Sequence, residues 1–225
     1  SVVKSPADGY TILYGAASEM AINASLFKTM MYNPKTDLEP VSLIATFPLI
    51  LVVPASSSAT LESLMKRANE QPGTVTYGSI GAGSPQHLAG ELLASSARAS
   101  LVHVPYKGSG PLVQDTMGGV VDIGISSLPP AINLIKAGKL RALAVTSATR
   151  VASLPEVPTM QELGFQGYEF NTWVGAAVPI GTPQDIILKI NQSLRTALAS
   201  DEIKKIFQEQ GAEPVGSTPA FFKTF

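Results

Sequence analysis

The sequence predicts an α/β fold in which a mostly parallel sheet is flanked by helices. Short β-prone runs alternate with helical segments, and three runs, at 75–77, 101–104 and 120–125, are each followed by a loop of Ser, Gly and Pro and then a helix. This alternation is typical of right-handed βαβ units, which place such loops at the carboxyl edge of a parallel sheet. A continuous apolar run at 47–53 is typical of a strand buried on both faces.

The loop after residues 75–77 is rich in glycine. Gly78, Gly81 and Gly83 permit backbone conformations closed to other residues, and Ser84 followed by Pro85 is a helix-start signal. Unpaired amide groups and the positive end of the helix dipole favour a small anion there. A tight strand-to-helix turn that binds nothing explains the same residues. The glycine spacing matches neither the Walker loop nor the dinucleotide fingerprint.

All three Ser, Gly and Pro loops are expected at one sheet edge, which is where open α/β sheets bind ligands. Three helix starts at this edge would offer many N–H and O–H donors to a carboxylate or phosphate. The alternative is a well-capped α/β domain, because Ser-Pro and Gly-Pro are ordinary helix-start signals.

The remaining elements are predicted from turn signals and apolar spacing. Two strands, 49–54 and 173–179, both end in Val-Pro and are interpreted as crossings between two domains. The other expected elements are strands at 10–14, 140–146 and 213–215, and helices at 19–27, 60–68, 160–163, 184–199, 201–210 and after 219.

Composition restricts the classes of partner. The chain has 225 residues, of which 45% are hydrophobic and 15% charged, with a net charge of -1 and no cysteine. The sequence contains no basic cluster of the kind that binds nucleic acid or an anionic membrane. Its longest apolar run is far shorter than the roughly 20 residues of a membrane span. A small molecule is the expected partner. The chain opens without Met, so we expect it to begin within a longer product.

No catalytic constellation is visible in the sequence. His87 and His103 belong to different elements with no cysteine beside them, which argues against a metal site. There is no Gly-x-Ser-x-Gly elbow, so a triad would need Ser84 or Ser109 to meet a histidine and Asp122 by coincidence of fold. We therefore expect no cofactor, no metal and no enzymatic activity.

Several motifs together resemble one family, the Bug-type solute receptors of tripartite tricarboxylate transporters. The resemblance covers nearly the whole chain. It is carried by Tyr77-Gly78-Ser79-x-Gly81-x-Gly83-Ser84-x-x-His87-Leu88-Ala89-Gly90-Glu91-Leu92, by Val104-Pro105-Tyr106-Lys107-Gly108, by Ala137-Gly138-Lys139-Leu140-Arg141-Ala142-Leu143-Ala144-Val145-Thr146, by Leu154-Pro155-x-Val157-Pro158-Thr159, by Trp173-x-Gly175, by Pro179-x-Gly181-Thr182-Pro183 and by Gly211-Ala212-Glu213-Pro214.

The resemblance implies a monomeric periplasmic binding protein of the type II-like, two-domain α/β class, with a mostly parallel sheet in each domain and a ligand cleft between them. Domain 1 is expected at 1–53 plus 178–225 and domain 2 at 54–177, with hinge strands near 49–54 and 173–179. The solute would be a di- or tricarboxylate, an amino acid or an aromatic acid, passed to membrane permease subunits. The implied ligand-binding residues are Ala17, Ser18, Ser79, Gly81, Gly83, Ser84, Tyr106, Lys107, Gly108, Ser126 and Ser127.

Two departures from the family pattern affect the expected site. Relatives carry a further strand and a loop rich in Pro and Gly ahead of residue 1, so we expect domain 1 to be incomplete within residues 1–225. Many relatives have an acidic residue at the position of Ser126, so the ligand is not transferable from any one of them. An α/β enzyme acting on a phosphorylated or carboxylated small molecule is the alternative function.

Overall fold

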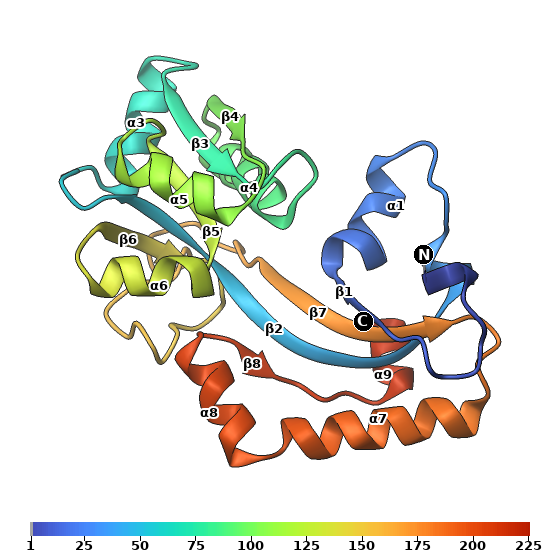
Figure 1. Ribbon diagram of the computed structural model, residues 1–225. Coiled ribbons are helices and arrows are strands. Elements are labelled where there is room, and N and C mark those ends of the chain that lie inside the picture. Colours follow the sequence, from blue (N-terminus) through green and yellow to red (C-terminus); the bar gives the residue numbers. More distant parts are fainter. Residues whose placement is uncertain (1) are drawn as a thin grey trace. The chain divides into compact units, whose positions relative to one another are not determined.

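In the computed structural model, which describes residues 2–225, one long strand, β2 (Leu38–Pro54), runs through both of the units into which the chain divides (Figure 1). One unit holds the residues up to Thr46 together with Thr172–Phe225, and the other holds Phe47–Asn171. The chain thus leaves the first unit within β2 and returns at the start of β7 (Asn171–Pro179). The two positions at which the chain passes from one unit to the other lie a few residues before the expected domain limits at 53/54 and 177/178.

The elements follow the chain in this order. The first unit contains η1 (Val2–Lys4), β1 (Leu13–Ala16), η2 (Ser18–Ile22), α1 (Asn23–Leu26), α2 (Pro34–Asp37), α7 (Gln184–Leu198), α8 (Asp201–Glu209), β8 (Glu213–Pro214) and α9 (Pro219–Thr224). The second unit contains α3 (Leu61–Glu70), β3 (Val75–Ser79), α4 (Pro85–Ala97), β4 (Leu101–Pro105), α5 (Ser109–Met117), β5 (Ile123–Ser127), α6 (Leu128–Lys136) and β6 (Leu140–Val145).

The sheet of the second unit confirms the predicted parallel arrangement for β3, β4 and β5. β3 pairs in parallel with β4 on one side and with β5 on the other. β2 then pairs antiparallel with both β5 and β6. The loops that follow β3, β4 and β5 therefore begin at the same edge of this sheet.

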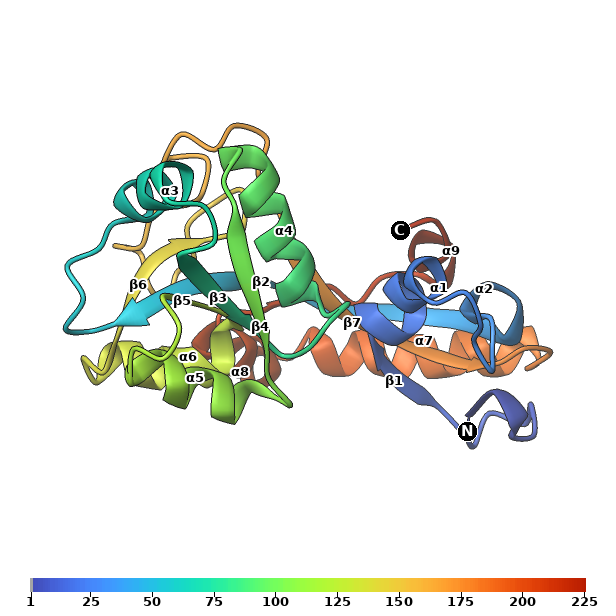
Figure 2. The ribbon, with the colours of Figure 1, turned by 90° about the horizontal axis from the view of Figure 1, so that it is seen from above.

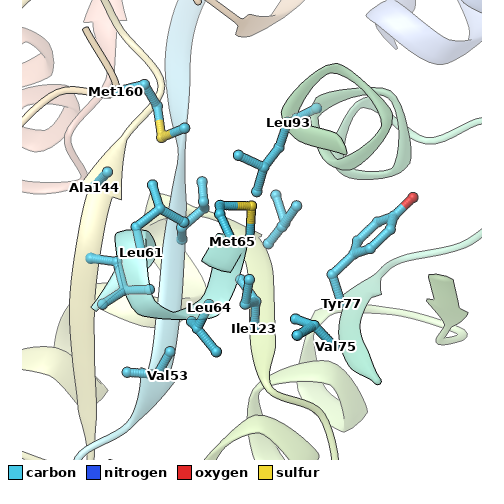
Figure 3. Close-up of a cluster of buried hydrophobic side chains, with 14 of the residues drawn as sticks. Val53, Leu61, Leu64, Met65, Val75, Tyr77, Leu93, Ile123, Ala144 and Met160 are labelled. Carbon is cyan, nitrogen blue, oxygen red and sulfur yellow. The ribbon is translucent and has the colours of Figure 1, made fainter. Parts of the chain in front are cut away.

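Helices cover both faces of the sheet in the second unit, with α3 and α4 on one side and α5 and α6 on the other (Figure 2). Alternate residues of β2 serve the two faces: Leu49, Leu51 and Val53 pack toward α3 and α4, whereas Ile50 and Val52 pack toward α5 and α6. Figure 3 shows the first of these cores, where side chains from α3 and α4 meet those of the strands. Burial on both faces explains the continuous apolar run of β2.

Close contact between α4 and β3 depends on Gly90. A Cβ atom at this position would overlap the ring of Tyr77, which is fully buried. The Tyr77 hydroxyl donates a hydrogen bond to Glu91 Oε1 at 2.6 Å, one residue further along the helix. The helix therefore lies directly on the tyrosine ring.

The expectation of a mostly parallel sheet in each domain is wrong for the first unit. There, β1 pairs antiparallel with β7, and β2 pairs antiparallel with β8. These strands come from distant parts of the chain and are not linked by successive strand-helix-strand crossovers. The rule that predicts parallel pairing therefore applies only to the second unit.

Two smaller predictions are corrected. The first strand begins at Leu13 instead of Tyr10, because Asp8 accepts a hydrogen bond from the Tyr10 amide and holds that segment in a turn. Residues 160–163 form turns and no helix, because the chain reaches Gly164 in a left-handed conformation (φ 93°) after a single turn.

Asp122 ties β3 to the segment that leads into β5. Its carboxylate accepts hydrogen bonds from the Thr76 amide at 2.8 Å and the Thr76 hydroxyl at 3.0 Å, and it pairs with the Arg67 guanidinium of α3. Burial raises the pKa of this carboxyl, but the hydrogen bonds from Thr76 and Arg67 lower it more, so the pKa lies below its ordinary value. The ionised form therefore stabilises the fold.

We predict that Asp122→Asn lowers the free energy of unfolding by about 1–2 kcal/mol at pH 7, because the carboxylate is partly screened by water. A depressed pKa gives stability above the ordinary value of 3.8 that is lost as the pH falls. The difference in the free energy of unfolding between the variant and the parent should therefore become smaller below that pH. Urea unfolding measures both effects, with Glu156→Gln, an exposed carboxylate, as control. Equal losses in the two variants would contradict this prediction.

Candidate functional site

The candidate site lies at the carboxyl edge of the second unit's sheet. The strand order there is β5, β3, β4, so the loop after β3 (residues 79–84, called the glycine loop below) starts between the other two. Residues 106–108 follow β4 and lead into α5, and Ser126 and Ser127 end β5 and lead into α6. The three helices α4, α5 and α6 thus begin near one edge, as the sequence predicted.

Ser84 closes the glycine loop and starts α4, which confirms the predicted helix start. Its Oγ accepts a hydrogen bond from the His87 amide at 3.2 Å and donates one to the Gly81 carbonyl at 2.7 Å. Gly81 and Gly83 have φ values of 128° and 79°, a region that strongly favours glycine. The loop is therefore fixed by its own side chains and backbone.

Ser79 is completely buried, and its hydroxyl is used inside the protein. Its Oγ accepts a hydrogen bond from the Gly81 amide at 3.1 Å and lies 2.6 Å from Nε2 of His103 on β4. Together with Ser84, this residue shapes the glycine loop from within and does not point a hydroxyl outward.

The second loop is joined directly to the first. The Tyr106 amide donates a hydrogen bond to the Ser79 carbonyl at 2.8 Å. The Tyr106 hydroxyl donates to Asp115 Oδ2 at 2.9 Å, and burial together with this carboxylate raises the pKa of Tyr106 to about 12. Lys107 is exposed, and Gly108, with φ 152°, precedes the first turn of α5. Lys107 contributes the one cationic side chain of these three loops.

The two serines of the third loop differ. Ser126 is fully buried and its Oγ donates to the Ser127 carbonyl at 2.9 Å. Ser127 is half-buried at the N-terminus of α6, and its hydroxyl forms no hydrogen bond with any other residue of 2–225. Ser127 thus keeps an available hydroxyl at this edge, as does Ser109, the half-buried first residue of α5.

Main-chain amides supply the largest set of available donors at this edge. The N–H groups of Ile80, Ala82, Lys107 and Gly108 have no hydrogen-bond partner within the part of the chain that the structure describes. They lie beside the N-termini of α4 and α5, where the helix dipoles add positive potential. This arrangement can bind a carboxylate or another small anion through the backbone.

The expected residues from the first domain, Ala17 and Ser18, belong to the first unit. Ala17 is buried and precedes η2, and Ser18 is the first residue of η2. The neighbouring Glu19 accepts a hydrogen bond from the Ala16 amide at 3.1 Å, which fixes this turn locally.

Sequence reasoning did not find the aromatic cluster behind the glycine loop. His87 and His103 are stacked with ring centroids 4.1 Å apart, and Tyr77 stacks on His103 at 5.0 Å. The feature that brings the cluster together is the pairing of β3 with β4, which sets Tyr77 beside His103. Strand register is not readable from the sequence alone. Among residues 2–225, no cluster of His, Cys, Asp and Glu is arranged to hold a metal ion.

The fold of this chain is an α/β fold that matches solved periplasmic binding proteins. A Rhodopseudomonas palustris protein, Rpa4515, solved with adipate, superposes with a TM-score of 0.93 at 38% identity, over 99% of this chain and 75% of that one. MatC of the same species, solved with bound malate, gives a TM-score of 0.87 at 25% identity, over 99% and 77%. None of the helices within residues 2–225 has the length and hydropathy needed to cross a membrane.

The sequence comparisons define the family. The family described as "Tripartite tricarboxylate transporter family receptor" matches residues 1–220. A protein from Pseudomonas sp. (strain P51), "UPF0065 protein in tcbD-tcbE intergenic region", is 39% identical over 97% of this chain, which spans 65% of that relative's length. The chain therefore belongs to the tripartite tricarboxylate transporter receptors, a family of periplasmic solute-binding proteins that are not enzymes.

We predict that Ser84→Ala lowers the free energy of unfolding by about 1 kcal/mol, because α4 loses its N-cap and the Gly81 carbonyl loses a donor. Ser96→Ala on the same helix is the control, since Ser96 is exposed and should change stability little. Denaturant unfolding followed by circular dichroism makes the measurement. A Ser84 variant as stable as the Ser96 variant would show that the cap is dispensable.

Proposed function

We propose that this protein is a periplasmic receptor that binds a small carboxylated solute at the carboxyl edge of the second unit's sheet. The observation that carries the proposal is the set of main-chain amides at residues 80, 82, 107 and 108 that have no partner in the described chain. The adipate and malate held by the two solved relatives support a dicarboxylate as the solute. Tricarboxylates, amino acids and aromatic acids belong to the same proposed class.

The chemistry of the edge favours recognition of a carboxylate by neutral donors. Carboxylate oxygens accept several hydrogen bonds, and backbone N–H groups at helix N-termini offer them without a buried cation. The Ser127 hydroxyl can add one more donor, and Lys107 can add a positive charge at the rim. In this proposal the buried Ser79 and Ser84 hold the amides of the glycine loop in position, and the buried Ser126 holds the backbone at Ser127.

Membership of the family extends the proposal to the whole receptor. We propose two domains that close around the solute, with hinge strands near 49–54 and 173–179 and with Ala17 and Ser18 contacting the solute from the first domain. In this proposal the closed, monomeric receptor delivers the solute to membrane permease subunits of a tripartite transporter. The protein has no role in nucleic-acid binding in this scheme, in agreement with its net charge of -1.

A thermal-shift screen tests the proposed solute class. The panel contains dicarboxylates including malate and adipate, tricarboxylates, amino acids, aromatic acids and sugar phosphates. A ligand present at about a hundred times its dissociation constant should add roughly 2.7 kcal/mol of stability. We expect a carboxylate to raise the melting temperature. A response to sugar phosphates alone would overturn the carboxylate proposal and favour an enzyme that acts on phosphorylated substrates.

We predict that Gly83→Leu weakens binding of that carboxylate at least tenfold, because a side chain at φ 79° distorts the amides of the glycine loop. Gly138→Leu is the matched control: Gly138 has φ 65°, open space around it, and lies in the turn between α6 and β6, away from the carboxyl edge. Both variants should lose similar stability. Calorimetry that finds equal affinity in the two variants would mean that the glycine loop takes no part in binding.

A further inference from the structure

The stacked histidines form a second layer directly behind the glycine loop. His87 lies in the first turn of α4 and His103 lies on β4, and their rings are 4.1 Å apart at an angle of 27°. Each ring is connected to the loop by one hydrogen bond. The two residues together are called the imidazole pair below.

The hydrogen bond at His87 fixes which ring nitrogen carries the proton. The Gly83 amide donates to Nδ1 of His87 at 3.1 Å. A backbone amide can only donate, so Nδ1 must be unprotonated, and the neutral ring carries its proton on Nε2. Nε2 lies 3.8 Å from Glu91 Oε1, which suits a proton on that nitrogen. If His87 were protonated on both ring nitrogens, its Nδ1–H would face the N–H of Gly83, and no hydrogen bond could form between them.

His103 is connected to the same loop through a hydrogen bond with Ser79. Nε2 of His103 lies 2.6 Å from Ser79 Oγ, and that oxygen also accepts the Gly81 amide. Ser79 can serve either protonation state of His103, because its hydroxyl is both donor and acceptor. The Gly83 amide has no such alternative, so His87 is the sensitive member of the pair.

The charged and titratable groups around the pair are few. Burial lowers the pKa of His103 and neighbouring His87 lowers it further, while Glu91 on α4 opposes both. Tyr77 on β3 donates to Glu91, and burial raises its pKa, so the phenol stays neutral. Asp115 on α5 is bonded to Tyr106, and Asp122 ahead of β5 is bonded to Thr76 and Arg67.

We propose that the imidazole pair is a set of positioning residues that makes the shape of the glycine loop depend on pH. In this proposal, acidification places a proton on Nδ1 of His87, so the hydrogen bond from the Gly83 amide is lost. The backbone of the glycine loop then changes conformation, and its amide groups move. The effect on solute binding rests on the proposed function, whereas the effect on the loop does not.

The sign of the stability change follows from His103. Its pKa in the folded protein is lower than in the unfolded chain, so the unfolded chain binds protons first as the pH falls through about 6.5. The stability that the neutral ring provides is therefore complete above that pH and declines below it.

NMR spectroscopy of the ligand-free protein tests the proposal directly, because the chain contains two histidines and both can be followed. We expect the Gly83 amide resonance to titrate with the same midpoint as the His87 ring. His87→Asn keeps an acceptor near the place of Nδ1 but cannot take up a proton, so its Gly83 resonance should not change between pH 8 and 5. The Gly138 amide, which donates to the Ile135 carbonyl, is the internal reference.

Two results would overturn the proposal. One is a Gly83 resonance that stays constant while both imidazoles titrate. The other is the same pH dependence in His87→Asn as in the parent. His103→Gln, which keeps a polar group near Ser79 Oγ, should leave the Gly83 titration in place, because the Gly83 amide is bonded to His87 and not to His103.

Calorimetry with the carboxylate found in the screen separates this proposal from the proposed function. Because the carboxylate itself takes up protons near pH 5, the two proteins are compared: affinity should fall about five- to tenfold more in the parent than in His87→Asn between pH 8 and pH 5, as expected for one lost hydrogen bond. A titrating Gly83 resonance in a protein that binds no carboxylate would overturn the function and leave the pH-dependent loop standing. An affinity equally pH-dependent in both proteins would overturn the role of His87.

Discussion

Parallel pairing of β3 with both of its neighbours is the constraint on which the site depends. Because β4 and β5 run in the same direction as β3, the three loops that follow them start at one edge. The register then sets finer contacts: the Tyr106 amide reaches the Ser79 carbonyl, and Tyr77 lies beside His103. Burial of Val75 and Tyr77 on β3 and of Ile123 and Ile125 on β5 in one core holds the register of these two strands, since a shift by one residue would turn these side chains away from that core.

Hydroxyl groups and amide groups have opposite roles at this edge. The hydroxyls of Ser79 and Ser84 are directed into the protein, where each holds a glycine of the loop. The amides of Ile80 and Ala82 are left without a partner in the described chain. Polar side chains therefore stabilise a backbone conformation, and in the proposed function the backbone provides the recognition chemistry. A site of that kind would distinguish solutes mainly by shape and by the number of acceptors, because its donors are nearly all alike.

Local signals predicted much of the second unit. Ser84 before Pro85 identified the start of α4, and the apolar run at 47–53 identified the buried part of β2, because both features act within a few residues. Pairing between distant segments was not predictable in this way. The antiparallel sheet of the first unit and the inward direction of the Ser79 hydroxyl both depend on partners far along the chain. Gly81, Gly83 and residues 106–108 lie in loops as the motif predicted, whereas Ser79, Ser126 and Ser127 end strands, and the contacts of each residue needed the structure.

The contact between Gly90 and Tyr77 has a consequence for how this protein can change over time. Any side chain at position 90 displaces the tyrosine ring, and that ring is stacked on His103. A substitution in the middle of α4 would thus be transmitted through two aromatic rings to Ser79 and the glycine loop. A larger residue at position 90 therefore requires a smaller or displaced side chain at position 77, so the packing of α4 on β3 constrains these two positions together.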